Sequence, residues 1–247
     1  MNLYPAIDIK GGKCIRLTKG KLEKITFYNS DPLEQAKEFV KLGANWIHMV
    51  DIDGAFKGEN CNHEIFIKIK KKIKCFIQVG GGIRNERTVA YLVDNNIDRI
   101  VLGTVAVTNP GLVKKVSTQF PGKIAIGLDA KKGFVATEGW SKIKKITVTE
   151  LAKQYEDMGI RHLIFTDIDK DGVLEGVSYD QLQGLLESTN INVIASGGVS
   201  SLEDIKKLKK ISTNYQNLVG VIVGKAIYEK RLQVEHAVNF LNKTNED

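Results

Sequence analysis

The 247-residue sequence predicts an α/β fold, a single (β/α)8 TIM barrel that spans residues 1–247 and contains a twofold half-barrel repeat. Three observations predict it. Eight short runs rich in Ile and Val recur, each followed by a turn and by a stretch with helical apolar spacing. The runs are continuously apolar, which is typical of parallel strands covered on both faces. Four motifs of the first half return in the same order in the second.

The eight expected strands leave room for a helix between successive members. We expect them at Leu3–Ile9, Trp46–Val50, Phe76–Val79, Arg99–Leu102, Ile124–Leu128, His162–Thr166, Asn192–Ala195 and Gly220–Val223. A doubly wound open sheet also alternates strands and helices, but it does not predict two equivalent halves. The pattern therefore favours a closed barrel.

Helical spacing between the strands predicts the helices that surround the barrel. Asp31 precedes Pro32 and Asn109 precedes Pro110, and a capping side chain followed by proline is a signal for a helix start. The chain has four prolines and no Ser/Gly-rich tract, so we expect no interdomain linker. The expected helices include Pro32–Leu42, Glu86–Asn95, Pro110–Phe120, Thr149–Met158, Tyr179–Glu187 and Ser201–Lys210.

The repeat pairs motifs that lie about half the chain length apart. Four pairs keep the same order in both halves, which indicates two half-barrels of four βα units each. The pairs are Ile7-Asp8 with Leu128-Asp129, Val50–Asp53 with Thr166–Asp169, Gly81–Ile83 with Gly197–Val199, and Val101–Thr104 with Ile222–Lys225.

The formal net charge of +7 suits an anionic small-molecule substrate, because positive potential near a cleft concentrates phosphates there. Lysine runs at Lys68–Lys74 and Lys206–Lys210 indicate solvated helix faces. A nucleic-acid-binding protein is the alternative of a different class. No motif that interleaves aromatic and basic residues favours it, so we expect no nucleic-acid partner.

The three cysteines, Cys14, Cys61 and Cys75, are odd in number and lack C-x-x-C spacing. This pattern favours reduced thiols over a disulfide framework or a zinc site, and we expect no metal. The sequence has neither a signal peptide pattern nor about 18 consecutive apolar residues. We therefore expect a cytoplasmic protein with no membrane partner.

Glycines at the ends of the third, fourth, seventh and eighth strands predict two anion sites. Glycine lets the backbone approach an anion closely, and the following helix starts offer free N–H groups. Tight turns need glycine as well, but two pairs at symmetric positions favour phosphate binding and a substrate with two phosphates. The predicted phosphate contacts are Gly81, Gly82, Gly103 and Thr104 in one half, and Gly197, Gly198, Gly224 and Lys225 in the other.

Asp8 and Asp129 end the first and fifth strands, which lie opposite one another in an eight-stranded ring. Catalytic residues of such barrels come from these strand ends. The alternative is that each aspartate caps the turn or helix that follows. Their equivalence in the repeat favours catalysis, in which two facing carboxyls divide the roles of acid and base.

Four further residues are candidate substrate contacts. His48 and Asp51 follow the second strand, and His48 is equally compatible with a packed core histidine. Arg84 follows the first glycine cluster, where a phosphate contact competes with a plain surface arginine. Trp140 lies in an excursion after the fifth strand, and it either stacks on a planar ring or anchors a hairpin. The acidic run Thr166–Gly172 lacks the glutamate of a calcium loop.

These motifs resemble the phosphoribosylformimino-5-aminoimidazole carboxamide ribotide isomerase family of histidine biosynthesis. The resemblance covers essentially the whole chain. One departure is Gly11, where many relatives carry Asp or Arg. The segments that carry the resemblance are Pro5–Asp8 with Gly12, Lys13 and Arg16, His48–Asp51, Gly80–Arg84, Gly127–Asp129, Gly139-Trp140, Thr166–Gly172 and Ala195–Val199.

The resemblance implies an Amadori rearrangement of a bisphosphorylated aminoaldose to an aminoketose. Asp129 would protonate the furanose ring oxygen, Asp8 would remove the proton from C2, and Thr166 would support the opened chain. A protonated imine is an adequate electron sink, so we expect no cofactor, and we expect a monomer. The resemblance adds four residues that contact the substrate, namely Arg16, Asp171, Gly172 and Ser196.

Two related activities stay open as alternatives. The cyclase subunit of imidazole glycerol phosphate synthase is similar in its half-barrel duplication and phosphate sites. That family typically reads Cys-Leu-Asp at the first strand, whereas this chain reads Ala6-Ile7-Asp8. A bifunctional isomerase would also accept phosphoribosyl anthranilate.

Overall fold

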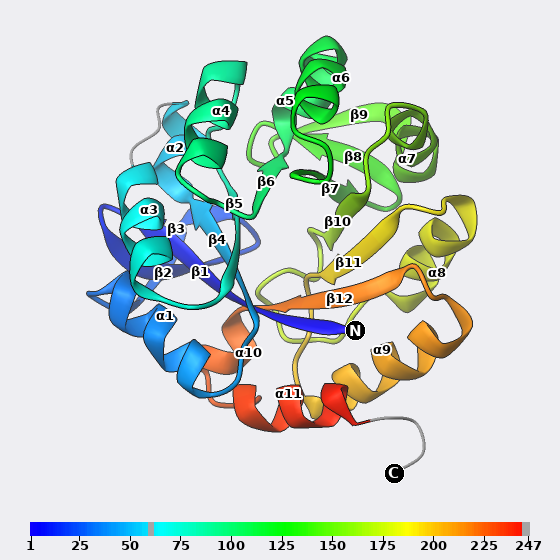
Figure 1. Ribbon diagram of the computed structural model, residues 1–247. Helices are drawn as coiled ribbons and strands as arrows, with labels where there is room; N and C mark the ends of the chain where they lie inside the picture. The colour runs from blue at the N-terminus through cyan, green and yellow to red at the C-terminus, as the bar shows by residue number, and fades with distance from the viewer. Residues whose placement is uncertain (59–61, 244–247) are drawn as a thin grey trace.

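The computed structural model describes residues 1–58 and 62–243, so Cys61 lies outside the described residues. Eight parallel strands form a closed barrel, which confirms the predicted fold (Figure 1). Strand β7 pairs with β10 and closes the ring. The barrel strands in chain order are β1 (Asn2–Lys10), β4 (Trp46–Asp51), β5 (Phe76–Gly80), β6 (Arg99–Leu102), β7 (Ile124–Lys131), β10 (His162–Asp167), β11 (Asn192–Ser196) and β12 (Leu218–Val223).

Helices form a ring around the strands (Figure 1). Both predicted proline-led starts are confirmed, because the side chains of Asp31 and Asn109 accept hydrogen bonds from backbone N–H groups of the helices that follow them. The helices are α1 (Pro32–Lys41), α2 (Ile52–Lys57), α3 (His63–Lys72), α4 (Glu86–Asp94), α5 (Thr104–Thr108), α6 (Pro110–Gln119), α7 (Val148–Asp157), α8 (Tyr179–Ser188), α9 (Leu202–Asn214), α10 (Lys225–Tyr228) and α11 (Val234–Asn242).

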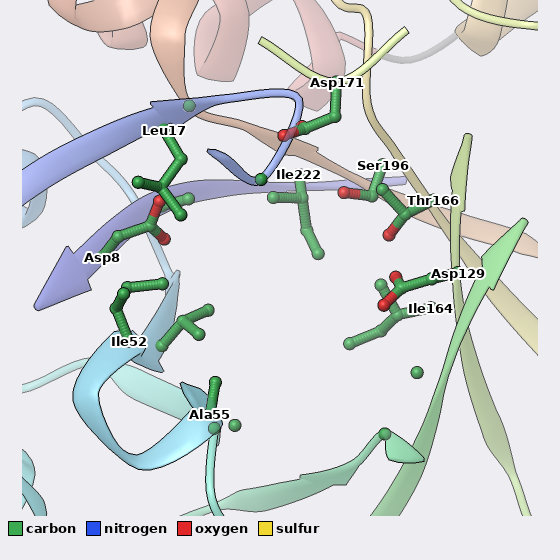
Figure 2. Close-up of a pocket in the computed structure, with 18 of the residues that line it drawn as sticks. Asp8, Leu17, Ile52, Ala55, Asp129, Ile164, Thr166, Asp171, Ser196 and Ile222 are labelled. Carbon is green, nitrogen blue, oxygen red and sulfur yellow. The ribbon is translucent and has the colours of Figure 1, made fainter. Parts of the chain in front are cut away.

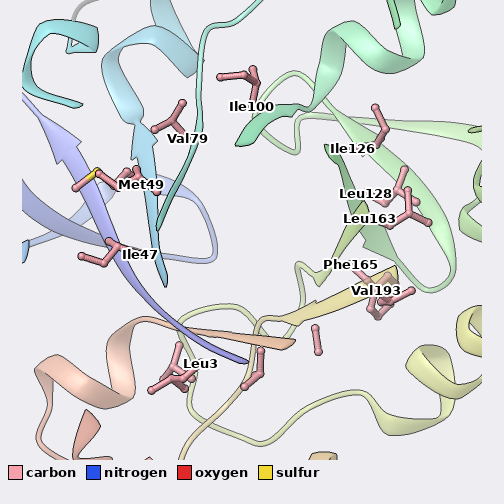
Figure 3. Close-up of a cluster of buried hydrophobic side chains, with 14 of the residues drawn as sticks. Leu3, Ile47, Met49, Val79, Ile100, Ile126, Leu128, Leu163, Phe165 and Val193 are labelled. Carbon is pink, nitrogen blue, oxygen red and sulfur yellow. The ribbon is translucent and has the colours of Figure 1, made fainter. Parts of the chain in front are cut away.

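Successive side chains of each strand point alternately into the barrel and toward the helices. The inward set fills the barrel with an apolar cluster that includes Ala6, Val101, Ile164 and Ile222. Ile164 and Ile222 also line a cavity at the carboxyl ends of the strands (Figure 2). The outward set packs beneath the helices as the main core, which includes Leu3, Ile47, Met49, Val79, Ile100, Leu163 and Phe165 (Figure 3).

Two antiparallel hairpins extend opposite strands of the barrel. β2 (Lys13–Thr18) and β3 (Lys21–Asn29) continue from β1, and β8 (Phe134–Thr137) and β9 (Lys142–Thr147) continue from β7. Because β1 and β7 are the first strands of the two half-barrels, the hairpins repeat in the same way as the motifs. Of the two, the sequence predicted only an excursion after the fifth strand.

Candidate active site

A cavity of about 300 Å³ lies at the carboxyl ends of the barrel strands, a size that suits a small metabolite. Asp8 lies on one wall, and Asp129 and Thr166 lie on the opposite wall (Figure 2). The structure brings all but one of the predicted site residues to this cavity. They are Asp8, Arg16, His48, Gly81, Gly82, Arg84, Gly103, Thr104, Asp129, Trp140, Thr166, Asp171, Gly172, Ser196, Gly197, Gly198, Gly224 and Lys225.

Asp8 forms an ion pair with Arg16, which lies on the neighbouring strand β2 of the first hairpin. The distance from Arg16 Nη1 to Asp8 Oδ2 is 2.7 Å, and both side chains are largely buried. Arg16 Nη2 also donates to the Ala6 carbonyl, and its guanidinium lies 5.0 Å from the centre of the Tyr228 ring. The antiparallel pairing of β1 with β2 therefore places a fixed cation beside this carboxylate.

Asp129 is surrounded by neutral donors instead. Trp140 Nε1 donates to Asp129 Oδ2 at 2.8 Å, and the Thr166 hydroxyl forms a further hydrogen bond with the same carboxyl. Thr166 lies on β10, directly across from Asp129 in the strand register. The hydrogen-bond partners of both carboxyls among the described residues are side chains and not the backbone N–H groups of a following helix or turn, so the capping alternative has no support here.

Burial raises the pKa of both carboxyls, and the partners oppose it differently. For Asp8, the charge of Arg16 acts against the rise in pKa and favours the carboxylate. For Asp129, only the hydrogen bonds from Trp140 and Thr166 act against the rise. The surroundings of the two carboxyls therefore differ: a cation stabilises the carboxylate form of Asp8, whereas Asp129 has only neutral hydrogen-bond donors.

Asp171 adds a third carboxyl at the rim of the cavity (Figure 2). Burial raises its pKa to about 7, and the negative charges of Asp8 and Asp129 act in the same direction. The positive charges of Arg16 and Lys225 oppose that rise. The Asp171 carbonyl accepts from the Lys19 N–H, so this loop is tied to the tip of the first hairpin.

The glycine loops lie at both ends of the cavity with matching geometry. Gly103 and Gly224 adopt nearly the same backbone angles, with φ of −95° and −111° and ψ of −110° and −96°. Gly81 and Gly197 both have positive φ. A Cβ on either would press against the backbone of Asp51 or Asp167, which explains the need for glycine.

The polar residues around these loops have distinct partners. Lys225 Nζ donates to the Gly172 carbonyl at 2.9 Å and to the Thr18 hydroxyl at 3.3 Å. The Thr104 hydroxyl accepts from the Glu138 N–H at the tip of the second hairpin. Arg84 is exposed at the rim, and Ser196 faces the cavity near Thr166 (Figure 2).

The two hairpin tips meet at the cavity. Gly20, at the tip of the first hairpin, packs against the ring of Trp140 so closely that a Cβ there would clash with the ring. Gly139, beside Trp140, lies against Phe56. The ring of Trp140 is therefore held between the first hairpin and Asp129.

Asp51 departs from its predicted role as a substrate contact. Its side chain is fully buried and does not line the cavity. The carboxylate accepts from the Gly54 N–H and from the backbone and side-chain N–H groups of Asn62. On β4 the inward positions are Trp46, His48 and Val50, so Asp51 points to the opposite face and caps α2.

His48 lines the cavity from β4 and is not simply a packed core residue. Burial, with a further contribution from the charge of Arg16, lowers the pKa of His48 to about 3. Its Nδ1 lies 3.0 Å from Nε2 of Gln78. Gln78 was not among the predicted site residues, although a glutamine inside the apolar run Phe76–Gly80 is a signal of a buried polar contact.

Two further findings concern metal ligands and membrane-spanning helices. No group of three or more His, Cys, Asp or Glu side chains in residues 1–58 and 62–243 is arranged to hold a metal ion. None of the helices in the same ranges is long and apolar enough to cross a membrane.

Known proteins match the chain over nearly its whole length. The sequence profile of a family described as histidine biosynthesis protein matches residues 2–233. A protein of Paramagnetospirillum magneticum, named 1-(5-phosphoribosyl)-5-((5-phosphoribosylamino)methylideneamino) imidazole-4-carboxamide isomerase, is 48% identical over 98% of this chain and 99% of its own. Proteins with that name from Brucella anthropi and Bacillus cereus are each 44% identical, over 98% and 96% of this chain and 98% of their own.

Proposed function

The chain belongs to the histidine biosynthesis protein family and is an aldose-ketose isomerase of that pathway, and from this premise we propose that Asp8 is its general base and Asp129 its general acid. One observation carries the proposal. The two carboxyls face the same cavity from opposite walls, one beside a cation and the other among neutral donors. Such a difference in surroundings is what separates a base from an acid.

The substrate that suits this cavity has a phosphate at each end. The loops at Gly81-Gly82 and Gly103-Thr104 lie at one end, and the equivalent loops of the second half-barrel lie at the other. The relatives' name describes a molecule with two phosphoribosyl groups, which matches this two-ended arrangement. The sugar that reacts would then lie between Asp8 and Asp129.

In the first step, Asp129 gives its proton to the furanose ring oxygen. The C1–O bond breaks, the nitrogen lone pair forms a C1=N double bond, and the opened sugar is a protonated imine. Thr166, which is hydrogen-bonded to Asp129, would hold that carboxyl toward the ring oxygen. Trp140 must leave its contact with Asp129 when the sugar arrives, and its ring is then free to stack on the substrate.

In the second step, Asp8 removes the proton from C2. The electrons of the C–H bond form a C1=C2 double bond, and the imine electrons return to nitrogen, which gives a neutral enolamine. Protonation of C1 and loss of the C2 hydroxyl proton then give the aminoketose, with no net change in protons. Arg16 would hold Asp8 as the carboxylate that this step requires.

The test compares Asp8→Asn and Asp129→Asn with the purified chain. General acid and base steps each contribute roughly 100- to 10,000-fold, so we expect kcat to fall by at least about 100-fold in either variant. Asp94→Asn changes an exposed carboxyl at the end of α4 and is the matched control. Conversion of the aminoaldose to the aminoketose is followed spectroscopically, without ammonia or a second protein.

The same proteins are tested in a histidine auxotroph that lacks the isomerase. The unchanged chain and Asp94→Asn should restore growth, whereas both active-site variants should not. A folded Asp8→Asn or Asp129→Asn protein with full kcat would overturn the assignment of the acid and base. Failure of the unchanged chain to isomerise the aminoaldose would overturn the proposed function itself.

A further inference from the structure

The structure points to a relay beneath the active site: we propose that Arg99 and Gln78 fix His48 in the form that carries its proton on Nε2, so that His48 presents a permanent N–H donor to the substrate. The inference rests on the proposed function, because the donor would serve a sugar oxygen at the floor of the cavity. Gln78 and Arg99 are positioning residues in this proposal, and neither lines the cavity.

The relay runs sideways across three neighbouring strands. His48 on β4 pairs in register with Gln78 on β5, and Gln78 pairs with Arg99 on β6. Gln78 Nε2 lies 3.0 Å from His48 Nδ1, and Arg99 Nη1 donates to Gln78 Oε1 at 3.0 Å. Gln78 is fully buried and Arg99 nearly so. Strand register therefore brings the three polar groups into one hydrogen-bonded row inside the barrel.

The direction of each hydrogen bond follows from what each group can donate. A guanidinium has donors only, so the Gln78 atom that faces Arg99 must be the carbonyl oxygen. The Gln78 amide nitrogen then faces His48, and an amide nitrogen only donates. His48 Nδ1 must accept, and a neutral imidazole that accepts at Nδ1 carries its proton at Nε2. The lowered pKa of His48 agrees with a neutral ring at physiological pH.

Arg99 is held in place by neutral partners. Nη2 lies 3.1 Å from Nε2 of His162, Nη1 donates to the Tyr4 hydroxyl at 3.3 Å, and the guanidinium lies 4.3 Å from the centre of the Trp46 ring. None of the ion pairs among the described residues gives Arg99 a carboxylate partner. A buried cation without an opposite charge is costly. The role of Arg99 as a donor that fixes Gln78 gives a functional reason for keeping a buried cation at this position.

The position of His48 indicates which oxygen it serves. His48 lies beside Ala6 in the strand register, two residues below Asp8 on the adjacent strand. Asp8 takes the proton from C2 in the proposed mechanism, so the oxygen bonded to C2 lies near both side chains. That oxygen becomes a carbonyl oxygen as the ketone forms. A neutral imidazole N–H stabilises an oxygen that gains negative charge without giving up its own proton.

The first test measures the tautomer in the protein without substrate. The chain has four histidines, and a His48→Asn variant assigns the His48 signals in nitrogen-15 NMR of histidine-labelled protein. We expect an unprotonated Nδ1 and a protonated Nε2 between pH 5 and pH 9. A proton on Nδ1 would overturn the relay. Because this measurement needs no substrate, its result is independent of whether the chain isomerises the aminoaldose.

The second test reverses the relay with Gln78→Glu. The new carboxylate keeps Arg99 as a partner but accepts a hydrogen bond from Nδ1–H of His48, so Nε2 of the neutral ring becomes an acceptor. We expect the His48 tautomer to reverse and kcat/KM to fall by roughly 10- to 100-fold, the effect of losing one hydrogen bond to the reacting oxygen. The pH profile should gain an ionisation, because the carboxylate raises the pKa of His48. Gln183→Glu, on α8 outside the barrel, is the matched control with unchanged activity.

Gln78→Met separates the tautomer from simple packing. It keeps the volume of the side chain and removes both hydrogen bonds, so His48 should populate both tautomers and kcat/KM should fall less than in Gln78→Glu. A reversed tautomer in folded Gln78→Glu with unchanged kcat/KM would overturn the proposal. If Gln78→Glu does not fold, equal activity of Gln78→Met and the unchanged chain would overturn it too.

Discussion

Asp8 and Asp129 occupy equivalent positions in the two half-barrels, yet only one of them has a charged partner. Arg16 reaches Asp8 from the first hairpin, whereas Trp140 reaches Asp129 from the second. Both partners are hydrogen-bond donors, and they differ in formal charge. At the scale of single residues, the assignment of base and acid therefore depends on which side chain each hairpin contributes.

Asp171 gives a prediction about stability and pH. Its pKa is about 7 in the folded chain against 3.8 for an ordinary aspartate, so between these pH values the folded state holds a proton that the unfolded state has lost. Stability from this group is therefore present below pH 4 and is lost as pH rises to 7. We expect Asp171→Asn to raise the stability at pH 8 by about 2 kcal/mol, which is roughly 4 to 8 °C in Tm.

Thermal unfolding at pH 8 and at pH 4 measures this effect. The Tm of Asp171→Asn should exceed that of the unchanged chain at pH 8 and match it at pH 4. Asp180→Asn, an exposed carboxyl on α8, is the control and should leave Tm unchanged at both values. Equal Tm values for Asp171→Asn and the unchanged chain at pH 8 would contradict the raised pKa.

Strand parity explains which site residues were predictable. Asp8 and Asp129 were predicted because they end apolar runs at equivalent positions of the repeat, whereas Thr166 was predicted from the family resemblance, and all three face inward. Asp51 also ends such a run, but it is one residue out of phase with His48 and Val50, so its side chain points away from the cavity. Counting the alternation along β4 would have found this. The contact between Gln78 and Arg99 crosses strands, and only the register of β5 and β6 reveals it.

At the scale of elements, the barrel strands were predictable and the first hairpin was not. The barrel strands are buried along most of their length, so their sequences are continuously apolar and can be recognised without the structure. β3 is mostly exposed and reads as polar, and β2 is defined by its antiparallel pairing with β1 and β3. Those pairings join neighbouring segments of the chain, but the polar residues of β3 leave no apolar pattern that would predict them. The contact between the two hairpin tips joins Gly20 with Trp140, which lie far apart in the chain, so only the fold reveals it.

The packing of Gly20 against Trp140 predicts that one hairpin positions the other. A Cβ in Gly20→Ala would clash with the Trp140 ring, so the ring must shift from its place between the first hairpin and Asp129. We expect tryptophan fluorescence to change and KM to rise by roughly 10-fold, because a hairpin tip that no longer packs normally against the ring cannot guide it onto the substrate. Steady-state kinetics and emission spectra measure the two effects.

Gly133→Ala is the matched control for this substitution. Gly133 lies between β7 and β8 and also has a positive φ, of 82° against 64° for Gly20, but a Cβ there meets nothing within 4 Å. Both variants therefore carry similar backbone strain, and only one displaces the ring. An equal KM in Gly20→Ala and Gly133→Ala would show that the hairpin contact does not position Trp140.

At the scale of the whole molecule, the twofold repeat gives a cavity with two similar ends that are not identical. A Cβ on Gly103 would meet nothing within 4 Å, whereas a Cβ on Gly224 would lie 2.8 Å from Cζ of Arg16. One of the two proposed phosphate loops is therefore independent of the proposed base, and the other lies against Arg16, which holds Asp8. The two ends should respond differently to the same substitution.

Gly103→Ala and Gly224→Ala test this asymmetry. An added methyl group at Gly103 occupies space where a phosphate would lie, so we expect KM to rise by roughly 10-fold with little change in kcat. At Gly224 the methyl group displaces Arg16, so both KM and kcat should change. Gly111→Ala, within α6, is the control. Equal kinetic effects of the two substitutions would contradict the asymmetry.

The hydrogen bond from Trp140 to Asp129 also has a kinetic consequence for the resting enzyme. The proposed acid, Asp129, already holds the indole before any sugar arrives, so we expect productive binding to require that the indole leaves first. At high substrate concentration, the rate of substrate binding is then limited by the rate at which the indole leaves Asp129. The observed rate of binding should level off at high concentration, and solvent viscosity should slow it less than it slows free diffusion.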